Sequence, residues 1–501
     1  MTNAILNKKL NDLKDIGFFD NLIIERGIEK EFFRIDPEGN ISEKSHPNSL
    51  GSALTNKFIT TDFAEAQLEL VTPIFEDLDE LYDFLYSLHV FSAKNLKDEE
   101  MLWPFSMPPT IKDESAINLG YYHQSNIGLL KHVYRRGLKT RYGPTMQCVS
   151  GMHYNFSLKK ESLQKFINDT EQCQIYDAYL GLLRNFKRIF WFVLIQFGQT
   201  NVVDKSFVKG RNHSLQNLND TDLYSEFATS LRMSDIGYQS KAQQSLDIKY
   251  NSLNSFLEKI KFAITSPYPE FEVMGLKNNN GDYHQISSGI IQIENEFYDS
   301  IRPKRPSVGG VRPYEMLKKL GIEYLEIRGV DISPFDIVGI SKDQIRFLDL
   351  ILIYCLIMPS PAIAPEEKKL IDENDKKVIY NGRDENTYIV IDNKKVNIRS
   401  ATKSIIKDLK DLATFFANSD EMTSSIISII EMEKGLLPEN SFHNDSLVKA
   451  KQNMSELVSS DCKYFDIIKK ESESSLEELT KMPTNTKTEM NDFVKNYNKN
   501  L

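Results

Sequence analysis

Carboxylates two residues apart stand out in GIEKEFFRI, residues 27–35, where Glu29 and Glu31 interrupt a run typical of a buried strand. Side chains at i and i+2 of a strand point to the same face, about 6 to 7 Å apart, and two like charges at that spacing repel each other. We therefore expect a metal ion or a basic partner beside Glu29 and Glu31.

The same spacing places polar side chains on one face of four further predicted strands. They are Glu65 with Gln67 and Glu69, His153 with Asn155, Gln292 with Glu294 and Glu296, and Glu326 with Arg328. For any one strand, a solvated face of an amphipathic sheet is the commoner explanation. Together, however, these faces carry Glu, Gln, Asn and His with arginine as their cation, although lysine is abundant elsewhere in the chain. This bias favours a shared site.

Carboxylates with one histidine suit a hard divalent cation, because Mg²⁺ and Mn²⁺ prefer oxygen ligands and accept an occasional imidazole. Zinc would want more His or Cys. Several carboxylates could hold more than one ion, and clustered divalent ions bridge phosphates in phosphoryl transfer, so we expect a nucleotide as companion. His153 could equally be a structural histidine.

The usual phosphate-binding loops are missing, since neither GxxxxGK[ST] nor GxGxxG occurs. This excludes P-loop and Rossmann enzymes, and phosphates would have to be held by metals and arginines. The best basic stretches are YRRGLKTRYG, residues 134–143, and IRPKRP, residues 301–306, which contains Arg302, Lys304 and Arg305. Either could be a solvated loop. IRPKRP follows the predicted strand QIENEFY, which would bring it to one end of the sheet.

The elements that must position these groups form an α+β pattern. Between about residues 22 and 330, five alternating runs predict strands of one sheet: LIIERGIEKEFFRI, LTNKFITTDFAEAQLELVTP, TMQCVSGMHYNFSL, SSGIIQIENEFY and GIEYLEIRGVDI. Between them, DLDELYDFLYSLHVFSAKNL and IYDAYLGLLRNFKRIFWFVLIQF repeat apolar residues at helical spacing.

The composition and the hydrophobic pattern of the sequence change after PSPAIAP, residues 359–365. A hairpin-like segment, KKVIYNGRDENTYIVIDNKKVNI, leads into highly charged helical sequence. We predict a catalytic region over residues 1–360 and a hairpin and helical region over 361–501 that packs on it. We expect no catalytic constellation in the second region.

Composition narrows the function classes. The 501 residues carry a formal net charge of -10, which argues against nonspecific binding to nucleic acid or to anionic membranes. The cysteines form no CxxC pair, which favours a reducing compartment over a disulfide framework: Cys148, Cys173, Cys355 and Cys462.

The apolar segments do not predict membrane spans. The N-terminus reads as an amphipathic helix and not as a signal peptide. IFWFVLIQF at 189–197 and FLDLILIYCLIMP at 347–359 are too short to cross a bilayer and are expected to be buried helices. We therefore expect a cytoplasmic protein without a membrane or nucleic-acid partner.

Several motifs, in order from about residue 20 to 360, closely resemble the proteobacterial type of glutamate–cysteine ligase, or γ-glutamylcysteine synthetase: GIEKEFFR, HPNSLGSALTNKFITTDFAEAQLELVTP, SGMHYNFS, TSLRMSDIGY, QIENEFYDSIRPKR and GIEYLEIRGVDISPF. The resemblance implies a glutamine-synthetase-like fold, a curved, mostly antiparallel sheet that forms a funnel, flanked by helices. It also implies a monomer that uses ATP to phosphorylate the γ-carboxylate of L-glutamate. The amine of L-cysteine then attacks the γ-glutamyl phosphate, giving γ-glutamylcysteine, ADP and phosphate, the first step of glutathione biosynthesis.

The resemblance also implies roles for individual residues. The positions that match the family's ligands for Mg²⁺, with Mn²⁺ as a possible substitute, are Glu29, Glu31, Asp62, Glu69, His153 and Glu326. Arg328 matches an arginine directed at the transferred phosphate, and Arg135 matches one near the acyl and phosphate groups. The positions that match the cysteine subsite are Phe63, Tyr134, Leu138, Gln147, Arg232, Tyr238 and Tyr298. Arg302, Lys304 and Arg305 are candidates for the nucleotide phosphates.

Two other readings remain open. A related carboxylate–amine ligase or a guanidino kinase would resemble the same fold but would use another acceptor. A catalytically inactive binding or regulatory protein would have lost at least one metal carboxylate, and none of the matching positions has lost its carboxylate.

Overall fold

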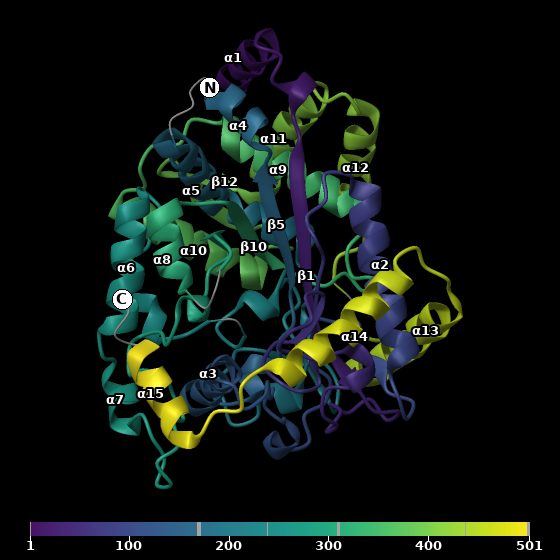
Figure 1. Ribbon diagram of the computed structural model, residues 1–501. Helices are drawn as coiled ribbons and strands as arrows, with labels where there is room; N and C mark the ends of the chain where they lie inside the picture. Colours follow the sequence, from purple (N-terminus) through teal and green to yellow (C-terminus); the bar gives the residue numbers. More distant parts are fainter. Residues whose placement is uncertain (1, 168–171, 238, 308–310, 436, 498–501) are drawn as a thin grey trace.

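The computed structural model describes residues 2–167, 172–237, 239–307, 311–435 and 437–497 (Figure 1). The strands are β1 (Ile24–Ile35), β2 (Ile59–Thr61), β3 (Gln67–Val71), β4 (Met101–Leu102), β5 (Met152–Leu158), β6 (Val202–Asp204), β7 (Gln216–Asn217), β8 (Asp222–Tyr224), β9 (Ile301–Lys304), β10 (Tyr324–Val330), β11 (Tyr388–Ile391) and β12 (Lys394–Asn397). The α-helices are α1 (Thr2–Asp15), α2 (Leu78–Asn95), α3 (Asn126–Tyr142), α4 (Lys160–Ile167), α5 (Gln172–Phe197), α6 (Leu253–Thr265), α7 (Pro269–Met274), α8 (Pro313–Leu320), α9 (Lys342–Ile357), α10 (Pro365–Asn381), α11 (Ile398–Ala413), α12 (Ser419–Glu431), α13 (Phe442–Ser459), α14 (Phe465–Lys481) and α15 (Lys487–Tyr497).

The main sheet runs in the order β2-β3-β1-β5-β10-β9, and β4 also pairs with β1. All of these neighbours are antiparallel. The central strands β1 and β5 lie side by side although more than a hundred residues separate them in the sequence (Figure 1). The open antiparallel sheet with flanking helices confirms the predicted α+β class.

The two faces of the central strands differ in chemistry because side chains alternate along a strand. Ile28 of β1, Tyr154 of β5 and Ile327 of β10 belong to a buried apolar core that also includes residues of α5 and α9. Helix α5 packs against α9 and over β9 and β10. The opposite face carries Glu29 and its polar neighbours. Burial of the apolar face therefore decides which side chains are left for the site.

The apolar segments form the buried helices predicted from the sequence. Residues 189–197 lie in α5, and α9 is buried along most of its length. Leu6, Leu10 and Leu13 bury one face of α1, as expected of an amphipathic helix. None of the helices in the described ranges is both long enough and apolar enough to cross a membrane.

One predicted strand is wrong. QIENEFY is not part of the sheet; Glu294–Glu296 forms a short 3₁₀ helix, and the edge strand is β9. Ion pairs override the local alternation, because Glu294 binds Arg312 (3.0 Å) and Glu296 binds the buried Arg141 (3.0 Å). The basic segment IRPKRP, for which a solvated loop was the alternative, is mostly the strand β9 itself, and an edge position tolerates its proline.

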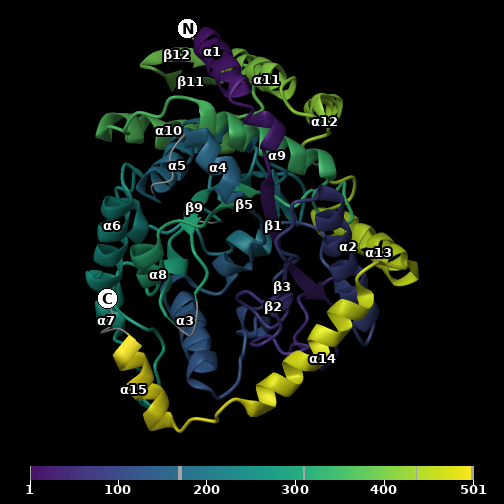
Figure 2. The same ribbon diagram turned by 45° about the horizontal axis from the view of Figure 1, so that its top comes forward.

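The C-terminal region wraps around the sheet domain. Helices α11 and α12 pack on α9, α13 and α14 pack on α2, and α15 packs on α3. Figure 2 shows α14 and α15 along the lower edge of the molecule. The predicted hairpin is present as β11 and β12, joined by Asp392 and Asn393 with positive φ angles of 49° and 59°. The first residues of the segment predicted as a hairpin, 376–381, belong instead to α10. One apolar core includes residues from both sides of position 360.

Candidate active site

A cavity of about 280 Å³ lies on the polar face of the sheet. Strands β1, β3, β5, β9 and β10 contribute one wall, and helix α3 with the segment between β2 and β3 contributes another. The cavity therefore collects side chains that are far apart in the sequence.

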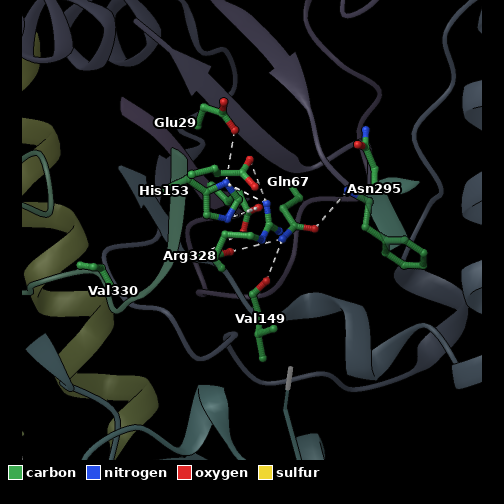
Figure 3. Close-up of polar contacts among 12 residues, drawn as sticks. Glu29, Gln67, Val149, His153, Asn295, Arg328 and Val330 are labelled. Carbon is green, nitrogen blue, oxygen red and sulfur yellow. Dashed lines mark hydrogen bonds and ion pairs between the residues drawn. The ribbon is translucent and has the colours of Figure 1, made fainter. Parts of the chain in front are cut away.

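The acidic part of the cavity is set by strand register. Glu29 lies directly opposite His153, and Glu31 lies opposite Glu69. One ligand atom from each of Glu29, Glu69 and His153 lies within 4.8 Å of the other two. His153 Nδ1 is 3.3 Å from Glu29 Oε2, and its Nε2 is 3.3 Å from Glu31 Oε1. The imidazole thus lies between two carboxylates, and Arg328 Nη1 approaches its Nδ1 to 3.3 Å (Figure 3).

On one side of this cluster, burial and the crowding of carboxylates outweigh the nearby arginines. Burial, followed by the charge of Glu31, raises the pKa of Asp62 to about 6. Burial, followed by the charges of Asp62, Glu29 and Glu31, raises the pKa of Glu69 well above its ordinary value. Crowded carboxylates of this kind are a donor set that a hard divalent cation would neutralise. The residues present therefore fit Mg²⁺ or Mn²⁺.

The β9–β10 side is rich in cations. Glu326 lies opposite Arg302, and its carboxylate binds Arg302 Nη2 (2.8 Å), Lys304 Nζ (3.2 Å) and Arg328 Nη1 (3.4 Å). Burial alone would raise the pKa of Glu326, but these cations outweigh burial and hold the pKa well below its ordinary value. Arg305 does not line the cavity, because its side chain turns to Glu323 (2.7 Å) and to the carbonyl of Gly321. Its predicted place beside the phosphates is thus not supported by the geometry.

Two of the polar residues grouped with the carboxylates support the site and do not form its wall. Asn155 donates from Nδ2 to Glu29 Oε1 (2.9 Å). Gln67 donates to the carbonyl of Val149 (3.1 Å), as Figure 3 shows. Glu65 lies outside the strands and accepts hydrogen bonds from the backbone N–H groups of His46 and Tyr121. The sequence pattern misplaced Glu65 because the residues between β2 and β3 form a turn.

Six of the seven predicted acceptor residues line the same cavity. Those that line the cavity are Phe63, Tyr134, Leu138, Gln147, Arg232 and Tyr298. The Tyr298 hydroxyl donates to Gln147 Oε1 (3.2 Å). Tyr238 lies outside the described residues.

The basic stretch at 134–143 is helical and not a loop. It belongs to α3, whose cavity face presents Lys131, Tyr134, Arg135 and Leu138 at helical spacing. Arg135 donates to the backbone carbonyls of Asp62 and of Thr61 (3.2 Å). The guanidinium therefore ties α3 to the segment that carries Asp62.

Sequence reasoning missed Lys131. Its ammonium lies 5.1 Å from the centre of the Tyr122 ring, and no carboxylate of the described residues forms an ion pair with it. Burial, followed by the charge of Arg135, lowers the pKa of Lys131 to about 8. The signal that could have found it is the helical spacing from Lys131 to Tyr134, Arg135 and Leu138.

Comparison with known proteins gives consistent matches. The family model "Glutamate-cysteine ligase" matches residues 11–378. The glutamate–cysteine ligase of Hahella chejuensis is 43% identical over 365 residues, covering 72% of this chain and 69% of that protein. The Erwinia tasmaniensis enzyme is 44% identical over 366 residues, covering 72% and 70%.

Two solved structures share the fold. The crystal structure of glutamate–cysteine ligase from Francisella tularensis in complex with AMP matches with a TM-score of 0.90 at 29% identity, covering 96% of this chain and 98% of that one. A bifunctional glutathione synthetase from Pasteurella multocida matches with a TM-score of 0.62 at 21% identity, covering 96% and 55%, and this likeness concerns the fold alone.

Proposed function

Since this chain belongs to the glutamate–cysteine ligase family, we propose that it uses ATP to join the γ-carboxylate of L-glutamate to the amine of L-cysteine, giving γ-glutamylcysteine, ADP and phosphate. The reaction passes through γ-glutamyl phosphate. The observation that carries this proposal is the single cavity in which a carboxylate–histidine cluster, several arginines and an amphipathic wall meet.

The carboxylates and the histidine of the cavity are assigned to the metal. The residues that would hold Mg²⁺, or Mn²⁺ in its place, are Glu29, Glu31, Asp62, Glu69, His153 and Glu326. When bound, these ions would neutralise the phosphate oxygens and the carboxylate that must approach one another. His153 lies between Glu29, which its Nδ1 contacts at 3.3 Å, and Glu31, which its Nε2 approaches to 3.3 Å, and these contacts orient its ring.

Each cationic side chain of the cavity is assigned to a different anionic group of the substrates. Arg328 lies beside His153 and is directed at the transferred phosphoryl group, and Arg302 and Lys304 bind the remaining nucleotide phosphates. Arg135 lies near the acyl phosphate. Lys131, one helical turn before Arg135, is available for the α-carboxylate of L-glutamate because no carboxylate among the described residues forms an ion pair with it.

The predicted acceptor residues that line the cavity are assigned to L-cysteine. Phe63 and Leu138 are buried and apolar, which suits the thiol side of the acceptor. Arg232 faces its carboxylate, and Tyr134, Gln147 and Tyr298 supply polar groups around it; Tyr238 belongs to the same proposal. This enclosure shields the acyl phosphate from water.

The division of the chain is also part of the proposal. All residues that line the cavity precede position 330, which agrees with a catalytic region over 1–360 and a packed region over 361–501. We place the protein in the cytoplasm as a monomer.

The test is ADP release with Mg²⁺, ATP and L-glutamate, comparing L-cysteine with L-2-aminobutyrate, L-alanine and no acceptor, with the product identified by mass. Release that is fastest with L-cysteine and stoichiometric with γ-glutamylcysteine supports the proposal. Ligation of another amine or of a guanidine, and none of L-cysteine, would refute the acceptor assignment while leaving the phosphoryl-transfer assignment standing.

A further inference from the structure

Arg232 lines the cavity, and hydrogen bonds to Asp331 and to two backbone carbonyls fix its guanidinium. Its Nε donates to Asp331 Oδ1 (2.8 Å), and its Nη2 donates to the carbonyls of Arg328 (2.9 Å) and Val330 (2.8 Å). The side chain is 2% exposed. Among the described residues, Nη1 has no hydrogen-bond acceptor, and it lies 2.9 Å from where a Cβ on Gly151 would be. Nη1 is thus the nitrogen left for a ligand in the cavity.

Both carboxylate oxygens of Asp331 accept two hydrogen bonds each. Oδ1 accepts from Arg232 Nε and from the Ser230 hydroxyl (2.9 Å), and Oδ2 accepts from the Gln199 N–H (2.9 Å) and the Thr200 hydroxyl (2.9 Å). The carboxylate is fully buried. Because its four donors come from two separate segments, residues 199–200 and 230–232, Asp331 cannot rotate without breaking several hydrogen bonds, and the guanidinium it binds is held in one orientation.

The charge around Asp331 also favours an anion in the cavity. Arg383, from the C-terminal region, packs behind the same segments and donates to the carbonyls of Gly198 (2.9 Å) and Ala228. Burial lowers the pKa of Arg383 to about 10, and the charge of Asp331 opposes that shift. Asp331 therefore feels the positive charge of two guanidinium groups, the buried Arg232 that binds it directly and the partly buried Arg383, so these three residues together carry one net positive charge.

The backbone adds a link to the metal cluster. Gly151, whose N–H donates to Glu31 Oε2 (2.9 Å), leaves room for the Arg232 guanidinium that a side chain would take. Asp331 directly follows β10, the strand that carries Glu326 and Arg328. The position of Arg232 is therefore tied to both strands that carry the phosphoryl-transfer groups.

We propose that Asp331 is the positioning residue that aims Arg232 at the α-carboxylate of the acceptor, and that this pair makes the enzyme select an α-amino acid over an amine that lacks the carboxylate. The inference rests on the proposed function. Asp331 does not line the cavity, so it would act on acceptor selectivity through Arg232.

The experiment compares L-cysteine with cysteamine, which keeps the thiol and the amine but lacks the carboxylate. Products are identified by mass, and kcat and KM are measured for each acceptor. In Asp331→Asn we expect the ratio of the two kcat/KM values, L-cysteine over cysteamine, to fall about tenfold or more. The fall should come mainly from the KM for L-cysteine, while the values for cysteamine, L-glutamate and ATP stay within about threefold of wild type.

The matched control is Asp349→Asn. Asp349 is also fully buried and binds an arginine, Arg26 (2.8 Å), but it lies on the helix-covered side of the sheet. We expect this variant to lose stability and to keep the wild-type acceptor ratio. If Asp331→Asn does not fold, Ser230→Ala tests the inference in its place. This variant removes the hydrogen bond from Ser230 to Asp331 Oδ1 without changing the charge of the protein. Its ratio should move in the same direction by about threefold.

The outcomes separate the two proposals. An Asp331 variant in which both acceptors slow by the same factor shows a merely structural role and overturns the inference. If Arg232→Lys loses the preference for L-cysteine but the Asp331 and Ser230 variants keep it, this inference alone fails. If the wild-type protein ligates neither acceptor, the proposed function fails first.

Discussion

Glu29 and His153 face each other directly on neighbouring antiparallel strands, with Glu29 Oε2 3.3 Å from His153 Nδ1. The pair joins residues 124 positions apart in the sequence. A slip of one residue in the register of β1 against β5 would turn one of them toward the apolar core. The candidate metal site is therefore a product of strand pairing, and the core that fixes the pairing also protects the site.

Replacement of either β1 carboxylate should stop the reaction without unfolding the protein. We expect Glu29→Gln and Glu31→Gln to lower ADP release by at least about a hundredfold, because a neutral amide is a poor ligand for a hard cation. Binding of Mn²⁺, followed by electron paramagnetic resonance without substrates, should weaken in parallel, and thermal melting should show a folded protein.

The control for these variants is Glu25→Gln. Glu25 lies on the same strand and hydrogen-bonds to Ser157, but it does not line the cavity. Its variant should keep wild-type turnover and Mn²⁺ affinity. Near-normal rates in both Glu29→Gln and Glu31→Gln would overturn the metal assignment.

Arg328 and Arg305 should differ sharply although both were assigned to phosphate groups from the sequence. We expect Arg328→Gln to reduce kcat by about 10² to 10³, the usual effect of removing one donor that stabilises developing charge. Arg305→Gln should stay within about twofold of wild type, because Arg305 pairs with Glu323 outside the cavity. Steady-state kinetics with saturating ATP measure both variants. An equal loss of kcat in the two variants would show that the phosphate site extends beyond this cavity.

Lys131→Gln should affect one substrate more than the others. If its ammonium binds the α-carboxylate of L-glutamate, KM for L-glutamate should rise about tenfold or more, since the variant loses a charge-assisted hydrogen bond in a buried site. KM for L-cysteine should change less than about threefold. The control is Lys139→Gln, an exposed lysine of the same helix, and a rise confined to KM for ATP would reassign Lys131 to the nucleotide.

Asp375 should make stability depend on pH. Its Oδ1 is buried without a hydrogen-bond partner among the described residues, and burial raises its pKa to about 8, opposed by Lys187. Between its ordinary pKa of 3.8 and about 8, the unfolded state loses the proton that the folded state keeps, so folding becomes less favourable as pH rises through this window.

Asp375→Asn removes this penalty. The variant should therefore gain stability relative to wild type, by a difference of about 1 to 3 kcal/mol at pH 8 that shrinks toward pH 5. Urea unfolding at pH 5, 6.5 and 8 measures it. Asp372→Asn, an exposed carboxylate on the same helix, should show no such trend, and a gain in Asp375→Asn that is constant across these pH values would contradict the prediction.

The local elements were predictable where one face is buried. The two-residue period of β1, β5 and β10 and the helical period of α2 and α5 are properties of the backbone, and burial of one face imposed the same period on the sequence. QIENEFY shows the limit, because its alternation was overruled by ion pairs of Glu294 and Glu296 with arginines distant in the sequence.

The sequence by itself determined which chemical groups are present and which of them share a face of a strand or helix, as with Glu29 and Glu31, because alternation depends on neighbouring residues alone. Only the tertiary structure decided that His153 lies opposite Glu29, that Lys304 enters the cavity while Arg305 leaves it, and that Lys131 joins the wall. The reason is that strand register and helix packing are fixed by burial between segments far apart in the chain, which no local spacing records.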